Sequence, residues 1–377
     1  MYLNMKSRGN NGSMKLLILT AFYPIPNGTH ERMFVHVRNM YYQRHGVNVT
    51  VLNFAANENY EIDGIKVITL NAFKNECAQY DIVVSHSANI RNHYLFLKKY
   101  GYKFDHLVFF FHGHEMLNFS KDYPYPYNYT SDAKFTKRNF RKIYDLLKIR
   151  LWTNYYRQLM YKSDLIFVSN WLFNRFRENT GIQKEELVNK YHIINNSVGR
   201  VFETLSYDFP SEKRYDFITV RSNLDGSKYC IDLLVRYAEK NPQAKFLLIG
   251  KGKFFNYNKL PKNVIWVSKT LSHNELTEYI NQSRCGLMLT REDTQGVMTC
   301  ELVTYGIPVI TSNIDVCHEF FANVSNVVMI DNGFPLADIC EISKKLWKKV
   351  PYKKEESCFA KNTIAKELLL FKRILES

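Results

Sequence analysis

The feature that most restricts the fold is a short apolar run, Lys15–Thr20, followed at once by a loop containing Pro24, Pro26 and Gly28. A strand that is apolar on both faces is typical of a parallel sheet covered by helices on both sides. The stretch from Glu31 to Arg44 then has helical spacing, and Val47–Leu52 is a second apolar strand. This alternation predicts an α/β protein with a doubly wound sheet.

The same pattern continues and then restarts after residue 214. Further strands are expected at 65–70, 82–85, 107–111 and 165–168, and after the restart at 216–220, 245–249, 264–267, 286–289 and 308–310. Helices are expected at 231–240 and 274–282 and from residue 299 onward. A chain of 377 residues is long enough for two such domains. We therefore predict a flexible leader (1–13), a first Rossmann-like domain (14–200), a linker (201–214), a second Rossmann-like domain (215–355) and a C-terminal helix (356–377) that packs back onto the first domain.

Charge and cysteine content restrict the partners and the setting. Lys and Arg number 51 against 36 Asp and Glu, a net charge of +15 that favours anionic partners such as nucleotides or an anionic membrane. No apolar run approaches the roughly 20 residues that span a bilayer. The seven cysteines contain no Cys-x-x-Cys pair, which indicates neither a zinc site nor a disulfide framework. A reducing cytoplasm is the expected setting.

The most informative stretch lies between the expected strand at 286–289 and the helix that follows it. Asp293 precedes the turn at Gly296, and Glu301 lies about one turn into the helix. The free N–H groups of a helix start, at Val297 and Met298, form a receptor for phosphate, and a glutamate at position 301 can bind a diol such as ribose. A second interpretation is that both acids only cap and solvate the helix.

This stretch resembles the retaining nucleotide-sugar glycosyltransferases of family 4, which have the GT-B fold of two Rossmann-like domains facing across a cleft. The family signature maps to Asp293, Gly296, Glu301 and Gly306-Ile307-Pro308-Val309. The resemblance implies that Asp293 lies beside the reacting sugar and that Gly296 and the amides of Val297 and Met298 contact the donor. It also implies that Glu301 holds the ribose. The family usually has Glu at position 293, so neighbouring Glu292 is the alternative for the first role.

Two basic residues match the part of the family that presents cations to the donor diphosphate. Arg221 and Lys228 lie after the first strand of the second half, with a longer spacing than usual. Fixed cations meet a physical need, because negative charge grows on the diphosphate as the glycosidic bond breaks. The chain has no Asp-x-Asp pair and no two His at helical spacing beside a carboxylate, so we expect a reaction without metal or cofactor.

On the first domain, His112 follows the apolar strand at 107–111 and matches the strand-end His of the family. The resemblance implies that it faces the donor sugar; the alternative is a hydrogen-bonded core histidine. Asn27 and Gly28 resemble the acceptor-side loop, where glycine allows close backbone approach to a ligand. A simple turn is the alternative there, and His86 is a further candidate for an acceptor contact.

Residues 134–162 carry nine Lys or Arg, one acid and many aromatic residues. This composition on a helical stretch favours a helix lying on an anionic bilayer, which would suit a lipid-linked acceptor. An ordinary solvated helix pair is the alternative. Nucleic-acid binding is not expected, since no recognised motif accompanies the charge.

The resemblance implies a retaining hexosyltransferase that moves a sugar from a nucleoside-diphosphate sugar to a glycan or lipid-linked glycan. Its setting would be bacterial surface polysaccharide synthesis, in the cytoplasm or on the inner face of the plasma membrane. Two alternatives are another GT-B enzyme, such as a sugar-nucleotide epimerase, and a non-catalytic protein that binds polyanions or membranes.

Overall fold

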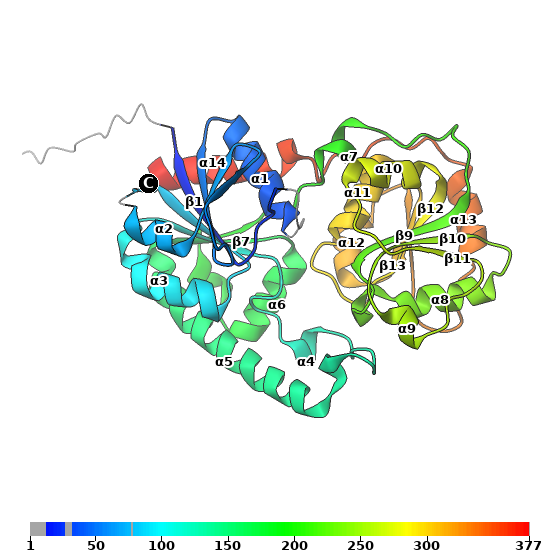
Figure 1. The fold of residues 1–377 in the computed structure, drawn as a ribbon, viewed down its shortest axis with the longest axis horizontal. Helices are drawn as coiled ribbons and strands as arrows, with labels where there is room; N and C mark the ends of the chain where they lie inside the picture. Colours follow the sequence, from blue (N-terminus) through cyan, green and yellow to red (C-terminus); the bar gives the residue numbers. More distant parts are fainter. Residues whose placement is uncertain (1–12, 27–31, 77, 377) are drawn as a thin grey trace, which may run out of the picture. The chain divides into compact units, whose positions relative to one another are not determined.

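The computed structural model describes residues 13–26, 32–76 and 78–376, and contains two largely parallel sheets (Figure 1). The first sheet has eight strands in the order β3-β4-β2-β1-β5-β6-β7-β8. Its strands are β1 (Lys15–Thr20), β2 (Asn48–Asn53), β3 (Tyr60–Ile62), β4 (Ile65–Ile68), β5 (Ile82–His86), β6 (Leu107–Phe111), β7 (Ser163–Phe167) and β8 (Tyr191–Ile193). The second sheet has six strands in the order β11-β10-β9-β12-β13-β14. They are β9 (Tyr215–Asn223), β10 (Phe246–Lys251), β11 (Val264–Val267), β12 (Ser283–Met288), β13 (Val309–Ser312) and β14 (Val327–Ile330).

Helices connect these strands in the βα alternation that the sequence predicts. Before β9 they are α1 (Met33–Arg44), α2 (Leu70–Asn75), α3 (Leu95–Tyr100), α4 (Phe119–Asp122), α5 (Phe135–Leu159), α6 (Asn170–Thr180) and α7 (Arg200–Thr204). After β9 they are α8 (Ile231–Lys240), α9 (Phe254–Tyr257), α10 (His273–Asn281), α11 (Val297–Tyr305), α12 (Asp315–Phe321), α13 (Ile339–Trp347) and α14 (Ile364–Glu376). The α/β fold class is confirmed.

By internal contacts the chain forms two compact units, one of Met1–Phe110 with Leu368–Ser377 and one of Phe111–Glu367. In the first unit, β1 is fully buried from Leu16 to Leu19, as a strand covered on both faces requires. The last helix returns to this unit, where the ring of Phe371 packs on Tyr42 with 5.5 Å between centroids. This is the return that the sequence predicts for the C-terminal helix.

The second sheet is buried on both faces because its strands alternate their side chains between two cores. Phe217 and Leu248 belong to one core with helices α8 and α13, whereas Ile218 and Leu247 belong to the other with α10, α11 and α12. Figure 1 shows helices on both sides of this sheet. A run that is apolar at every position is therefore needed here, and the period-2 pattern of a half-exposed strand is absent.

The strand order of the second sheet places a topological switch point between β9 and β12. From β9 the chain moves outward to β10 and β11, and from β12 it moves the other way to β13 and β14. In doubly wound sheets, ligands bind at the carboxyl ends of the strands beside such a point. The segments that leave β9 and β12, at 221–229 and 289–296, therefore lie where a ligand is expected.

Several expected elements differ in detail from the structure, among them the following three. The strand expected at 65–70 ends at Ile68, because the Thr69 side chain accepts a hydrogen bond from the Ala72 amide and starts α2. The expected linker contains a short helix, α7. Residues 135–159 form one long helix, α5, where a helix pair was the alternative.

Candidate functional site

Arg221 lies at the carboxyl end of β9, beside the switch point. It is only 6% exposed, and its Nη2 donates a 2.7 Å hydrogen bond to the Leu289 carbonyl at the end of β12. Its Nε is buried and has no hydrogen-bond partner among the described residues. A buried guanidinium with an unused donor favours an anionic ligand, because an unpaired buried donor is costly.

Gly250 on the neighbouring strand β10 packs closely against the backbone of Arg221 on β9. It lies in β10 with a φ of 146°, and a Cβ at this position would be 1.8 Å from the carbonyl oxygen of Arg221. Only glycine combines this backbone conformation with so close an approach. Gly250 thus packs directly against the Arg221 backbone.

The two segments that leave β9 and β12 are bound to each other. Arg291 makes an ion pair of 2.6 Å with Asp232 and donates a 2.7 Å hydrogen bond to the carbonyl of Ser227. The carbonyl of Lys228 accepts hydrogen bonds from the Arg291 amide and the Thr290 hydroxyl. These bonds fix the position of Lys228 relative to the segment that carries Asp293.

Lys228 and Arg221 share one aromatic ring. The Lys228 Nζ lies 4.8 Å and the Arg221 Cζ 5.0 Å from the centroid of the Tyr229 ring. Burial works against the charged ammonium, but Tyr229 and Asp293 favour it and raise the pKa of Lys228 above its ordinary value. The structure therefore brings together Arg221, Lys228 and Asp293, as the sequence predicts.

Helix α11 begins at this place without a side-chain cap. Its N-cap residue, Gly296, has a φ of 72° and, being glycine, has no side chain that could accept a hydrogen bond from the first turn. The amides of Val297 and Met298 are therefore left without intrahelical acceptors, as the first turn of a helix always leaves them. Asp293 Oδ1 accepts hydrogen bonds from the amides of Thr294 at 2.8 Å and Gln295 at 3.4 Å. Both amides precede Gly296, so Oδ1 of Asp293 stabilises the turn before α11 and does not cap the helix, while Oδ2 accepts no hydrogen bond from a described residue.

Glu301 is buried on α11, and the structure gives it partners that the sequence did not suggest. Its Oε1 accepts a 3.0 Å hydrogen bond from the Gly199 amide and lies 3.6 Å from Nε2 of His273. Burial raises the pKa of Glu301, although His273 and the Gly199 amide favour the ionised form. Its Oε2 makes no hydrogen bond with a described residue, which leaves an acceptor for a hydroxyl group.

Gly199 and His273 could not be found from the sequence, because they lie 102 and 28 residues from Glu301 and belong to no recognisable motif. A Cβ on Gly199 would be 2.4 Å from the His273 ring. This tight packing holds the imidazole beside the carboxylate. Tyr229 was also missed, since an aromatic residue next to a lysine carries no specific signal.

Glu292, the alternative to Asp293, has a distinct environment. Its Oε1 is buried and has no hydrogen-bond partner among the described residues. Burial is the main cause that raises the pKa of Glu292 to about 8, and the charges of Asp122 and Asp293 act in the same direction. Glu292 is therefore mostly protonated at neutral pH, whereas Asp293 faces a lysine.

His112 directly follows β6, and its backbone is held from two directions. The buried carboxylate of Glu115 accepts hydrogen bonds from the amides of His112 at 3.1 Å and Gly113 at 2.7 Å. The His112 carbonyl accepts a 2.9 Å hydrogen bond from the Thr294 hydroxyl, next to Asp293. His112 is thus brought beside the Asp293 segment, and Glu115 is a positioning residue that alternation along the chain did not reveal.

Asn27, Gly28 and His86 are the residues expected to contact the acceptor. Asn27 and Gly28 lie outside the described residues. His86 is fully buried and stacks on Phe110 with 4.6 Å between ring centroids. Burial, with the charge of Arg38 next, holds the pKa of His86 well below its ordinary value. This places His86 in the core, away from solvent.

Helix α5 carries the basic stretch 134–162, and its two faces differ. Lys148 is buried, where its Nζ lies 2.8 Å from Asp145 and donates to the carbonyls of His114 and Leu117. Trp152 and Tyr156 are buried as well, so these three residues belong to the core and not to a surface. The other face is exposed and carries large apolar side chains: Phe135, Phe140, Ile143, Tyr144, Leu146, Leu147 and Leu151.

Among the described residues, no group of three or more His, Cys, Asp or Glu side chains is arranged to hold a metal ion. No helix within the described ranges is both long enough and apolar enough to cross a membrane.

Residues 217–346 match the model of the family described as glycosyl transferases group 1, which covers β9 to α13 and hence Arg221, Lys228, Asp293 and Glu301. This part of the chain is a group 1 glycosyltransferase domain, in agreement with the family 4 resemblance. No curated protein matches the sequence of the chain.

Solved structures show that the fold extends over the whole chain. A sucrose-phosphate synthase from Thermosynechococcus elongatus aligns with a TM-score of 0.67 at 11% identity, over 96% of this chain and 99% of its own. A glycosyltransferase from Rickettsia africae aligns with 0.65 at 14% identity, over 97% and 99%. The catalytic domain of starch synthase IV from Arabidopsis thaliana, bound to ADP and acarbose, aligns with 0.59 at 10% identity, over 97% and 100%.

The fold is therefore GT-B, with two Rossmann-like α/β parts. The family is shown for one part of the chain, residues 217–346, which match the group 1 glycosyltransferases.

Proposed function

We propose that the protein is a retaining glycosyltransferase that transfers a hexose from a nucleoside-diphosphate sugar to a hydroxyl of a glycan or lipid-linked glycan. The observation that carries this proposal is the buried Arg221 with its unused Nε, next to Lys228 and the uncapped start of α11. Cations and free amides directed at one point suit a diphosphate.

The diphosphate is held by Arg221, Lys228 and the amides of Val297 and Met298. As the bond from the anomeric carbon to the diphosphate breaks, the electron pair leaves with the phosphate, and the fixed cations stabilise this charge. These groups meet the need for positive charge from the chain's own residues, so we propose a reaction without metal or other cofactor.

The ribose is held by Glu301 through Oε2. Gly199 and His273 fix the other carboxylate oxygen, so the glutamate is oriented before the ligand arrives. An oriented carboxylate that accepts from two neighbouring hydroxyls distinguishes ribose from sugars without them.

The sugar contacts Asp293 Oδ2, Gly296 and His112. We assign the first acidic role to Asp293 and not to Glu292, because Glu292 is mostly protonated at neutral pH. The acceptor hydroxyl attacks the face from which the diphosphate leaves, and its proton passes to the departing phosphate oxygen, which retains the anomeric configuration. Asn27 and Gly28 belong to the acceptor side in this proposal.

A thermal-shift screen of nucleoside diphosphates and their sugars tests the donor class. We expect stabilisation by at least one nucleoside diphosphate, lost in Arg221→Ala and kept in Arg236→Ala, which removes an exposed arginine on α8. The absence of any shift in the wild-type protein would contradict the proposal. Product analysis without acceptor separates transfer from epimerisation, which changes the sugar without an acceptor.

We further propose that the acceptor is presented at an anionic membrane on the cytoplasmic side, as in the synthesis of bacterial surface polysaccharide. Phe140, Tyr144, Leu147 and Leu151 are spaced by four, three and four residues, so they form one stripe along α5. All four are exposed, between 38% and 76%. Exposed basic residues border the stripe: Lys137 lies three residues from Phe140, and Arg150 lies three residues from Leu147. An apolar stripe with basic borders fits the interface of an anionic bilayer.

Flotation with vesicles of phosphatidylglycerol and phosphatidylcholine tests the membrane proposal. The double variant Phe140→Ser, Leu147→Ser should float about tenfold less, since each apolar side chain of the stripe contributes to insertion. Val188→Ser, which removes an exposed apolar side chain from a loop outside α5, should float like the wild type. Equal flotation of the double variant and the wild type would contradict this proposal.

A further inference from the structure

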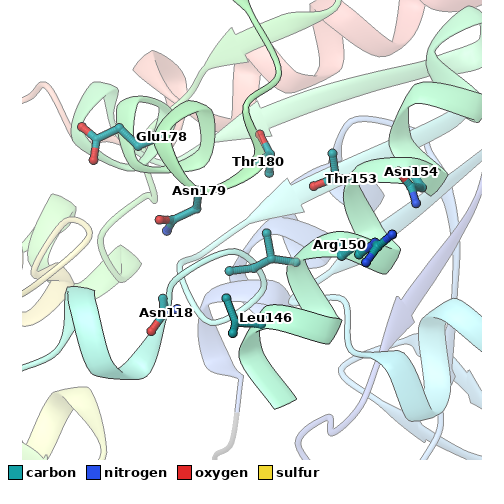
Figure 2. A pocket seen from close by; sticks show the side chains of 9 residues that line it. Asn118, Leu146, Arg150, Thr153, Asn154, Glu178, Asn179 and Thr180 are labelled. Atoms are coloured by element: carbon teal, nitrogen blue, oxygen red, sulfur yellow. The ribbon is translucent and has the colours of Figure 1, made fainter. Parts of the chain in front are cut away.

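A groove lies between α5 and the end of α6, outside the site described above. It has a volume of about 460 Å³ and is lined by Leu146, Arg150, Thr153 and Asn154 of α5, with Asn118 and Asn179 opposite. Figure 2 shows the α5 side chains on one side of the hollow, with Asn118 and Asn179 across from them.

The groove contains a buried hydroxyl that the fold does not use. Thr153 is 6% exposed, and its Oγ1 has no hydrogen-bond partner among the described residues. A buried polar group without a partner is uncommon and indicates a missing one. The partner that fits is a group entering from the groove.

The charge of the groove is positive. Glu178 at its rim is paired with both Arg175 at 2.8 Å and Lys121 at 3.3 Å. Arg150 makes no ion pair with any described residue, and its side chain is exposed. Asn154 is also exposed and adjoins Arg150 on the lining. The groups available to a ligand are thus a guanidinium, an amide and a hydroxyl.

The groove is continuous with the apolar stripe of α5. Arg150 and Asn154 line the groove, and they lie three residues along α5 from Leu147 and Leu151 of the stripe, so the groove and the stripe are neighbours on the helix surface. A lipid with its acyl chains along the stripe would therefore have its headgroup at the mouth of the groove.

We infer that this groove binds the headgroup of an anionic lipid, specifically a phosphodiester that carries free hydroxyl groups. Arg150 binds the phosphate, and Thr153 and Asn154 bind the hydroxyls. A guanidinium suits the phosphate oxygens, and an amide and a hydroxyl suit a diol. This inference rests on the membrane part of the proposed function and adds recognition of one headgroup to general attraction by charge.

The test compares vesicles of phosphatidylcholine that contain an equal mole fraction of either phosphatidylglycerol or phosphatidylserine. The two lipids have the same net charge, but only the first headgroup has a diol. We expect the wild-type protein to bind phosphatidylglycerol vesicles about fivefold more tightly. Arg150→Gln, Thr153→Val and Asn154→Leu should each remove this preference. Asn154 is exposed, so Asn154→Leu keeps the test independent of any effect of Thr153→Val on folding.

Lys137→Gln is the matched control, because it removes the same charge from the border of the stripe on α5 but does not line the groove. It should weaken binding to both vesicles equally and keep the preference. Equal binding of both vesicles by the wild type would overturn the headgroup site while leaving the membrane proposal standing. Absence of binding to either vesicle would overturn both. If free glycerol 3-phosphate protects the protein from thermal unfolding as strongly as the lipid vesicles do, the lipid source is wrong.

Discussion

The guanidinium of Arg221 and the ring of Tyr229 lie 5.0 Å apart, and the ammonium of Lys228 lies 4.8 Å from the same ring. Two cations beside one aromatic residue repel each other, and the negative face of the ring offsets part of this repulsion. Tyr229 therefore keeps both cations available for one anionic ligand.

Substitution of Tyr229 by Ala should weaken nucleoside diphosphate binding about tenfold, because the cations lose their common support. Tyr229→Phe keeps the ring and loses only the hydroxyl, so its affinity should lie between those of Tyr229→Ala and the wild type. Calorimetric titration with the nucleoside diphosphate that best stabilises the wild type measures both. An unchanged affinity in Tyr229→Ala would show that the ring has no part in holding the cations.

The raised pKa of Glu292 predicts that the stability of the folded protein depends on pH. Its pKa is raised from 4.5 in the reference state to about 8 in the fold, so the folded state binds this proton more tightly. The resulting stabilisation is complete below about pH 4.5 and is lost as the pH rises through about 8. Glu292→Gln has no such proton, so its melting temperature should increase relative to that of the wild type between these values. If the melting temperatures of Glu292→Gln and of the wild type change with pH in the same way across this range, the raised pKa of Glu292 is contradicted.

Gly250→Ala should destabilise the protein by about 3 kcal/mol, because it adds an unfavourable φ to a clash with the Arg221 carbonyl. Nucleoside diphosphate affinity should fall with it, since Arg221 must move. The control is Gly333→Ala, where a Cβ meets no described atom within 4 Å. Denaturant unfolding and the same titration check both variants, and equal unfolding midpoints would argue against the tight approach.

The alternation of apolar strands and helices was sufficient to predict most of the fold. The helix expected at 231–240 is confirmed as α8, and the one expected at 274–282 begins one residue earlier, where Ser272 and Glu275 form a capping box. The strands β3, β8 and β14 were not predicted, because with three, three and four residues they are too short to show periodicity. Their pairing depends on neighbours that lie elsewhere in the chain.

The site was predictable where it follows a motif and not where it depends on tertiary packing. Arg221, Asp293 and Glu301 lie at strand ends or on a helix start, which any doubly wound sheet brings to one edge. The contacts of Glu301 with Gly199 and His273, and of Glu115 with the amides of His112 and Gly113, arise from chain folding. The same holds for the raised pKa of Glu292, which burial determines.

The central claim is that Arg221 and Lys228 hold the diphosphate and Glu301 the ribose of one donor. The most direct measurement is the ratio of affinities for a nucleoside diphosphate and its nucleoside, together with the ratio for the ribose and 2′,3′-dideoxyribose forms of that diphosphate. Arg221→Ala should reduce only the first ratio and Glu301→Ala only the second, each about tenfold. If both ratios stay at their wild-type values in both variants, the donor is not bound by these residues and the account is wrong.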